Sequence, residues 1–358
     1  MNNSKLYINL SAPSNIALVK YWGKKNGQKP INPSLSLTLN NCQTHMEVVI
    51  EKSDFFDLSI EFESIPNEKF RQKILHKISK LGPEFEKWLP AFSNLKYTIK
   101  SYNSFPHSSG IASSASSMAA LSFVFKCVLE QFYKIETNRN EWSSLARQLS
   151  GSASRSVDAP FMAWGIHQKY FQLKDDYALN LDNILEQQKV HPDFKNMHDA
   201  IVIVDAGVKS VSSSDGHALM DRHPHRESRI ALANLHFEQI IEAMVAGNFL
   251  EFADILEREA LDLHAMMMTS SPSVILLKPN SLKVIDWVRR TREQEKINIS
   301  FTIDPGPNIH LIYLDKDREK VLELLKAEQA KKMDAIFNNI IFDHQGTGPM
   351  IHKLHWMD

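Results

Sequence analysis

Two kinds of hydrophobic spacing divide the first half of the chain into expected strands and helices. Strand-like runs rich in β-branched and apolar residues occur at 46–51 and 95–101. Apolar positions at helical spacing cover 68–81 and 113–133. Strands and helices that follow one another without strict alternation favour an α+β fold over a doubly wound parallel sheet.

The second half opens after a polar stretch at 187–196. The apolar run that follows, 200–205, predicts a buried strand that begins a new unit. Beyond it the pattern predicts helices over 226–246, 250–267, 281–295 and 317–330, and strands over 299–303, 309–314 and 335–342. A chain of 358 residues is long enough for two domains of ordinary size, which we place at 1–195 and 196–358.

Composition and charge remove several classes of protein. Lys and Arg number 41 against 42 Asp and Glu, so no basic excess is available to bind nucleic acid. The chain has neither an apolar leader nor an apolar run of membrane-spanning length, which predicts a cytoplasmic protein without a membrane partner. Cys42 and Cys127 are too few for a disulfide framework, and we expect two buried thiols.

The segment 105–117 carries the most informative pattern for chemistry. Small and polar residues around Gly110 run directly into an apolar helix, with Ser113 and Ser114 at its start. Because the first N–H groups of a helix are unsatisfied and lie at the positive end of its dipole, this arrangement suits a phosphate. The alternative is that the serines only cap the helix. Neither the P-loop pattern nor the dinucleotide glycine fingerprint occurs.

Four other segments place a polar side chain at a turn or loop. Arg155 lies in the small-residue turn 150–156, Lys24 follows an apolar strand, Asp304 precedes a Pro-Gly turn, and Lys209 begins a serine-rich loop. An arginine fork can hold a carboxylate or a phosphate, and the lysines could offset negative charge. Taken singly, each also fits a plain structural role: a helix-capping arginine, a surface lysine, a turn-forming aspartate or a solvated loop.

Together, six segments in order resemble one family. They are Asn15 to Lys24, Asn32 to Ser36, Phe105 to Ala115, Ser150 to Ser156, Lys209 to Ser213 and Thr302 to Asn308. The set resembles the diphosphomevalonate decarboxylase family of the GHMP kinase superfamily. The resemblance implies a two-domain α+β architecture, with an ATP-binding domain over 1–195, a C-terminal GHMP domain over 196–358 and the active site in the cleft between them. It also implies a homodimer.

The resemblance further implies the reaction. ATP, with Mg²⁺, phosphorylates the 3-hydroxyl of mevalonate 5-diphosphate, and the 3-phosphate then leaves with CO2 to give isopentenyl diphosphate, a step of isoprenoid biosynthesis. Phosphate is a better leaving group than hydroxide, and loss of the carboxylate quenches the positive charge that builds at C3. Positioning and electrostatics therefore dominate, as in other phosphoryl transfers.

Residue roles follow from the same resemblance. Asp304 is expected to hold or deprotonate the 3-hydroxyl, Arg155 to clamp the substrate carboxylate, and Lys24 to lie beside Asp304. The other expected substrate contacts are Tyr21, Ser150, Gly151, Ser152, Lys209, Ser212 and Ser213. The expected ATP contacts are Asn103, Ser108, Ser109, Gly110, Ile111, Ala112, Ser113 and Ser114, with Mg²⁺ near Ser113 and Ser114.

The chain departs from the family pattern in three places. It has Asp158-Ala-Pro160 where many members have glycines, His217 where they usually have Met, and Ser214-Asp215 after the serine loop. A decarboxylase acting on the 5-monophosphate is therefore the first alternative. A mevalonate 3-kinase and a non-catalytic GHMP-fold binding protein follow, and both are expected to have lost part of the Asp304, Lys24 and Arg155 set.

Overall fold

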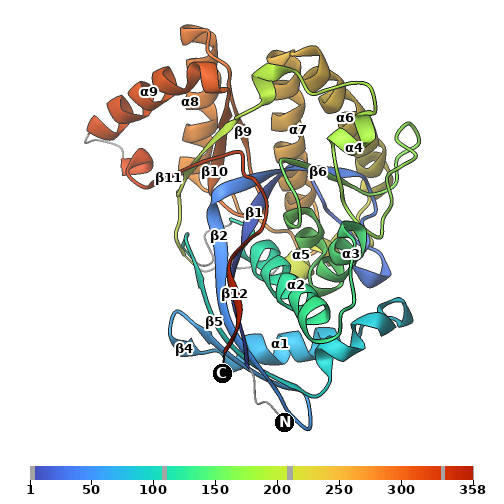
Figure 1. Ribbon diagram of the computed structural model, residues 1–358. Coiled ribbons are helices and arrows are strands. Elements are labelled where there is room, and N and C mark those ends of the chain that lie inside the picture. Colours follow the sequence, from blue (N-terminus) through green and yellow to red (C-terminus); the bar gives the residue numbers. More distant parts are fainter. Residues whose placement is uncertain (1–4, 107–110, 208–212, 332–334, 358) are drawn as a thin grey trace.

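The computed structural model describes residues 5–106, 111–207, 213–331 and 335–357, without the side chains of residues 213, 214 and 335 (Figure 1). Two antiparallel-rich sheets and their helices form an α+β fold, as the hydrophobic pattern predicted. The C-terminal lobe, with α6 to α9, lies above the larger N-terminal sheet in Figure 1.

The larger sheet is built mainly from the first half of the chain. Its path runs β12-β1-β2-β5-β3-β4, with β6 and β7 branching from β2. All neighbours are antiparallel except β3 and β5, which are parallel. The strands are β1 (Lys5–Val19), β2 (Ser34–Lys52), β3 (Asp57–Phe62), β4 (Ile65–Pro66), β5 (Leu95–Asn103), β6 (Phe161–Trp164), β7 (Leu179–Asn180) and β12 (Met350–Met357).

The first half also contains four α-helices and four short 3-10 segments among its described residues. The α-helices are α1 (Glu68–Ile78), α2 (Ser113–Phe132), α3 (Arg139–Leu149) and α4 (Asp182–Leu185); the short 3-10 segments are η1 (Asn26–Gln28), η2 (Pro83–Phe92), η3 (Gly151–Ser156) and η4 (Pro192–Phe194). The mostly apolar helix α2 packs on β1 and β2, and its buried face completes the first core cluster.

The smaller sheet has the order β11-β8-β10-β9 and is antiparallel throughout. Its strands are β8 (His198–Val202), β9 (Ile299–Thr302), β10 (Ile309–Tyr313) and β11 (Ile340–His344). The accompanying helices are α5 (Ser213–Ala218), α6 (Arg226–Ala246), α7 (Phe249–Met268), α8 (Pro279–Glu295) and α9 (Arg318–Ala330), with 3-10 segments η5 (Asp315–Asp317) and η6 (Ala335–Phe337). The strand expected over 335–342 thus starts five residues late, because a 3-10 turn takes its first residues.

Strand β1 links the two halves. Its first residues alternate between buried and partly exposed side chains, whereas every residue from Leu10 to Val19 is buried. The second stretch is covered on both faces, since its apolar residues share a core cluster with α6 and α7 of the second half. The end of β1 therefore delivers the residues that follow it into the junction between the halves. The boundary near residue 195 stays a prediction.

Candidate functional site

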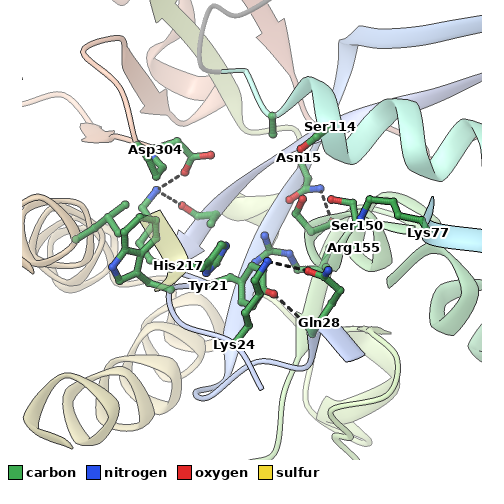
Figure 2. Close-up of a pocket in the computed structure, with 18 of the residues that line it drawn as sticks. Asn15, Tyr21, Lys24, Gln28, Lys77, Ser114, Ser150, Arg155, His217 and Asp304 are labelled. Atoms are coloured by element: carbon green, nitrogen blue, oxygen red, sulfur yellow. Dashed lines mark hydrogen bonds and ion pairs between the residues drawn. The ribbon is translucent and has the colours of Figure 1, made fainter. Parts of the chain in front are cut away.

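A cavity lies at that junction, directly beyond the end of β1 (Figure 2). The first half contributes residues that follow β1, two lysines of α1 and the start of η3. The second half contributes His217 of α5, Leu263 of α7, and Asp304 and Pro305 after β9. The cavity brings together nine of the predicted site residues: Tyr21, Lys24, Ala112, Ser114, Ser150, Gly151, Ser152, Arg155 and Asp304.

Lys20, rather than Lys24, pairs with Asp304. Lys20 Nζ lies 3.0 Å from Asp304 Oδ1 and also donates to the Ala17 carbonyl at 2.8 Å. Lys20 is 1% exposed, and burial lowers its pKa while the Asp304 carboxylate opposes that shift. The position beside Asp304 that we expected for Lys24 is therefore occupied by Lys20, four residues earlier in the same motif.

The backbone of Lys20 is held from both sides. Its N–H donates to Glu259 Oε2 at 2.8 Å, and its carbonyl accepts from Asn32 Nδ2 at 3.0 Å. Glu259 is itself fully buried and bound by both terminal nitrogens of Arg229. These cationic and N–H partners lower the pKa of Glu259 to about 2 despite its burial. A fixed charged group on α7 thus sets the position of Lys20.

Asp304 follows β9 at the start of the turn that leads into β10. Its neighbour in space is His264 of α7, which is 1% exposed and hydrogen-bonded to the Asp304 backbone. Burial and Lys20 lower the pKa of His264 to about 4, so the ring is neutral at pH 7. One helix, α7, therefore contacts both members of the Lys20–Asp304 pair.

Arg155 is a buried cation without an ion pair among the described residues. It is 3% exposed, donates from one terminal nitrogen to Ser34 Oγ at 3.0 Å, and lies over the Tyr21 ring. Its Nε is buried without a hydrogen-bond partner. Burial lowers the pKa of Arg155 to about 10, which still leaves it charged at pH 7. A buried guanidinium with unused donors fits an anionic ligand.

Three further lysines face the cavity, and the sequence pattern identified only Lys24. Lys24 Nζ donates to Gln28 Oε1 at 3.0 Å, while Lys73 and Lys77 come from successive turns of α1. Burial lowers the pKa of all three, for Lys77 to about 8. Within the described part of the chain none of them makes an ion pair, so the cavity holds five cationic side chains and one carboxylate.

Tyr21 and the start of η3 form a tightly packed wall. Tyr21 Oη donates to the Gln28 carbonyl at 2.9 Å. A Cβ added to Gly151 would lie only 2.4 Å from Tyr21 Oη. Asn15, a cavity residue not expected from sequence, donates to Ser156 Oγ at 2.8 Å and leaves its buried Oδ1 without a partner. Only glycine at position 151 permits the close approach of Tyr21 to the start of η3.

A second cavity adjoins the first at the start of α2. It is lined by Asn103, Ser113 and Ser114 together with apolar and polar residues of β3, α1 and α2, and it shares Lys73 and Ser114 with the first cavity. The residue preceding α2 is Ala112, and no side chain caps the helix. The alternative that Ser113 and Ser114 serve as caps is therefore wrong.

The remaining predicted residues divide into two groups. Ile111 is 2% exposed and packs in the core, where its carbonyl accepts from Ser14 Oγ. Ser108, Ser109, Gly110, Lys209 and Ser212 lie outside the described residues, as does the side chain of Ser213.

Two places bear on metal binding. Ser113 and Ser114 offer hydroxyls at the second cavity, and Ser114 also lines the first, which fits a Mg²⁺ ion held mainly by phosphate oxygens and water. Among the described residues, His236, Glu259 and Asp262 also lie close enough to hold a cation. The Glu259 carboxylate, however, is already occupied by Arg229 and His236. That cluster is therefore a structural charge network.

Comparison with known proteins gives one consistent result. A family model of the diphosphomevalonate decarboxylase-like N-terminal domain matches residues 12–178, and one of the mevalonate 5-diphosphate decarboxylase C-terminal domain matches 200–350. The chain is 30% identical over 329 residues to the diphosphomevalonate decarboxylase of Candida albicans, covering 88% of this chain and 86% of that protein. It is 28% identical to that of Danio rerio, covering 89% and 79%.

Solved structures agree over almost the whole length. A structure of MDDEF in complex with MVAPP, AMPPCP and magnesium has a TM-score of 0.76 at 26% identity, covering 98% of this chain and 99% of the other. Mevalonate diphosphate decarboxylase from Staphylococcus aureus has a TM-score of 0.80 at 24% identity, covering 98% of each. The described residues contain no helix of the length and apolarity needed to cross a membrane.

Proposed function

Because the chain belongs to the diphosphomevalonate decarboxylase family, we propose that it converts mevalonate 5-diphosphate and ATP to isopentenyl diphosphate, ADP, phosphate and CO2. The observation that carries this proposal is the charge of the cavity, where five cationic side chains face a single carboxylate. A substrate with a carboxylate and a diphosphate, beside the phosphates of ATP, supplies the missing negative charge.

The Lys20–Asp304 pair lies where the hydroxyl group reacts. Asp304 accepts the proton of the 3-hydroxyl while the hydroxyl oxygen attacks the γ-phosphorus of ATP. The bond from that phosphorus to the ADP oxygen breaks. Lys20 keeps the carboxylate oriented through the 3.0 Å contact and offsets charge on the transferring phosphoryl group. Lys24 is left to bind the substrate phosphates, which keeps the substrate contact expected from sequence but not the place beside Asp304.

Arg155 acts in the second step. Its unused donors hold the substrate carboxylate while the 3-phosphate leaves with the electron pair of the C3–O bond. The C–C bond to the carboxylate then breaks, its electrons form the alkene, and CO2 departs. Holding the carboxylate in line with the leaving group lets each bond cleavage assist the other.

ATP fits the second cavity and the uncapped start of α2, with Asn103 and Lys73 on its walls. The N–H groups at this helix end attract phosphate oxygens. Mg²⁺ near Ser113 and Ser114 would supply charge neutralisation for the β- and γ-phosphates. The ATP and the mevalonate derivative would then meet at Ser114, which lines both cavities.

An assay of ATP-dependent CO2 release tests the proposal. Mevalonate, its 5-phosphate and its 5-diphosphate are compared at equal concentration, with ADP measured in parallel. We expect the 5-diphosphate to have the highest kcat/KM, with ADP and CO2 formed one to one. A higher kcat/KM for the 5-phosphate would establish the monophosphate alternative, and ADP without CO2 would establish the 3-kinase. The homodimer and the cytoplasmic location remain predictions.

A further inference from the structure

His217 is a buried titratable residue in the cavity that the mechanism above does not use. It lies on α5, is 8% exposed, and packs against two aromatic rings, with centroids 4.4 Å from Tyr21 and 5.1 Å from Trp22. Its ring also lines the first cavity. Packing alone would be served by an apolar residue, so the polar atoms of the ring require an explanation.

The hydrogen bond on one side of the ring fixes its tautomer. The Gly23 N–H donates to His217 Nδ1 at 3.0 Å, so Nδ1 is the acceptor nitrogen and the proton resides on Nε2. Burial lowers the pKa of His217 to about 3, and the charges of Lys24 and Arg155 act in the same direction. At neutral pH the ring is therefore a neutral donor through Nε2.

The donor has no partner within the part of the chain that the structure describes. The hydrogen bond that His217 makes within the protein is formed at Nδ1. Nε2 has no protein partner among the described residues but is not fully enclosed by other atoms. Nε2–H therefore faces open space, and the open space that His217 borders is the cavity. A desolvated, oriented donor beside cationic groups suits an anionic oxygen.

The place of His217 in the cavity indicates which part of the substrate it meets. In the view of Figure 2, His217 lies between Asp304 and Lys24. In the proposed mechanism Asp304 marks the reacting hydroxyl, and the positive charge of Lys24 adds to burial in lowering the pKa of His217. Lys73 and Lys77 line the same cavity as Lys24, and the positive charges of Lys73 and Lys24 help to lower the pKa of Lys77. These lysines make the part of the cavity that they line the place for a phosphate.

We propose that His217 is a specificity-determining residue whose Nε2–H donates a hydrogen bond to a phosphoryl oxygen of the substrate diphosphate. This inference rests on the proposed function for the identity of the substrate, but the phosphate contact can be measured without turnover. A hydrogen bond to a charged oxygen typically changes affinity by about 10- to 100-fold.

The test uses two substitutions at this position and one control. His217→Met fills a similar volume without a donor, and His217→Gln keeps an N–H near the position of Nε2. His167→Met is the matched control, because His167 is 7% exposed, accepts the Lys169 N–H at Nδ1, and packs on Tyr170 and Phe237 outside the cavity. Thermal unfolding of each variant shows whether it is folded.

Binding of inorganic pyrophosphate by calorimetry and KM for mevalonate 5-diphosphate are both measured. We expect His217→Met to weaken both by about 10- to 100-fold with kcat changed less than about threefold, and His217→Gln and His167→Met to stay within about threefold of wild type. Unchanged pyrophosphate affinity in folded His217→Met, or an equal loss in His217→Gln, would overturn the proposal. A wild-type protein that binds pyrophosphate but releases no CO2 would instead refute the proposed function alone.

Discussion

The ion pair between Asp304 and Lys20 predicts that Asp304 affects the rate of reaction more than the affinity for substrate. The Lys20 ammonium is buried at the junction, whereas the Asp304 carboxylate is partly exposed, and 3.0 Å separates Nζ from Oδ1. The pair is neutral as a whole, so Asp304 adds little to the attraction of an anionic substrate. In the proposed mechanism its contribution is to accept the proton that the 3-hydroxyl loses.

Asp304→Asn should therefore abolish catalysis while leaving binding in place. The amide is nearly the same size but accepts a proton poorly, and general-base groups contribute about 10²- to 10⁴-fold to rate. We expect kcat for CO2 release to fall at least 10²-fold with ATP affinity within about threefold of wild type, measured by CO2 release and calorimetry. A kcat above about a tenth of the wild-type value would remove Asp304 from the proton transfer, since tenfold is only about 1.4 kcal/mol.

Gly151 offers a steric test of the substrate wall. A methyl group there would stand 2.4 Å from Tyr21 Oη and 2.9 Å from Cζ, well inside contact distance. Gly151→Ala should push Tyr21 away from the Gln28 carbonyl and raise KM for the substrate at least about tenfold. Tyr21→Phe removes the nearest clashing atom, the oxygen, but keeps Cζ at 2.9 Å. Adding Gly151→Ala to Tyr21→Phe should therefore raise KM by less than adding it to the wild type. Equal KM values for wild type and Gly151→Ala would contradict the packing described.

The two neutral histidines at the junction predict an acid-sensitive fold. His217 and His264 have pKa values of about 3 and about 4, below the value near 6.5 of an unfolded chain. Above pH 6.5 neither state binds the proton, whereas below it the unfolded state binds more protons, so stability falls as pH falls. At pH 5 each histidine should lower the free energy of unfolding by about 2 kcal/mol relative to pH 7. Urea unfolding of wild type and His264→Gln at pH 7 and pH 5 should show a smaller decline in the variant.

The sequence could identify the motif but not which lysine in it meets Asp304. Lys20 and Lys24 belong to one run, Lys-Tyr-Trp-Gly-Lys, and β1 ends just before it at Val19. Within a strand the side-chain period would assign each residue to a face, but that period is lost in the turn that begins at Lys20. The Asp304, Arg155 and Gly151 positions were found because their loops are distinctive. Lys73 and Lys77 were missed because a helical pattern does not indicate which neighbour the helix faces.

At the scale of elements, α7 supports the reacting pair. Glu259 binds the Lys20 backbone and His264 the Asp304 backbone, five residues apart on the same helix. Glu257 on α7 is also buried and paired, but its partners are Arg289 and Arg292. The helix therefore carries two charge networks, of which one touches the site.

Comparing Glu259→Gln with Glu257→Gln should distinguish an effect of α7 on catalysis from an effect on stability. Glu259→Gln leaves the buried Arg229 charge less well paired, and breaking a buried pair typically costs about 3–5 kcal/mol. Glu257→Gln should cost less, because its partners Arg289 and Arg292 are partly exposed. We expect both variants to lose stability by urea unfolding. Only Glu259→Gln should also lower kcat, by about tenfold or more, because the amide has one accepting oxygen for the four donors from Lys20, Arg229 and His236 and so holds the Lys20 backbone less well. An equal kcat in the two variants would show that α7 acts on stability alone.

At the scale of the whole molecule, most helices lie within a few residues of where their hydrophobic pattern placed them. The helices expected over 113–133 and 226–246 are α2 (Ser113–Phe132) and α6 (Arg226–Ala246). The pattern did not show that β12 returns to the first sheet, because strand pairing over such a distance leaves no local signal. Nor did it show that Asp343 accepts N–H donors from Asn40, Asn41 and Cys42, which fastens β11 to β2.

The pairing of β1 with β12 has a consequence for how the protein is made. Lys5 lies opposite Met357, and Ser11 lies opposite Met350. While a ribosome is still producing the second half, residues 5–11 therefore have β2 on one edge and an unpaired edge on the other. Such an edge can recruit a strand from another nascent chain. The early sheet must wait for residues more than 300 positions later, and that waiting period is when a cell short of chaperones would lose this protein to aggregation.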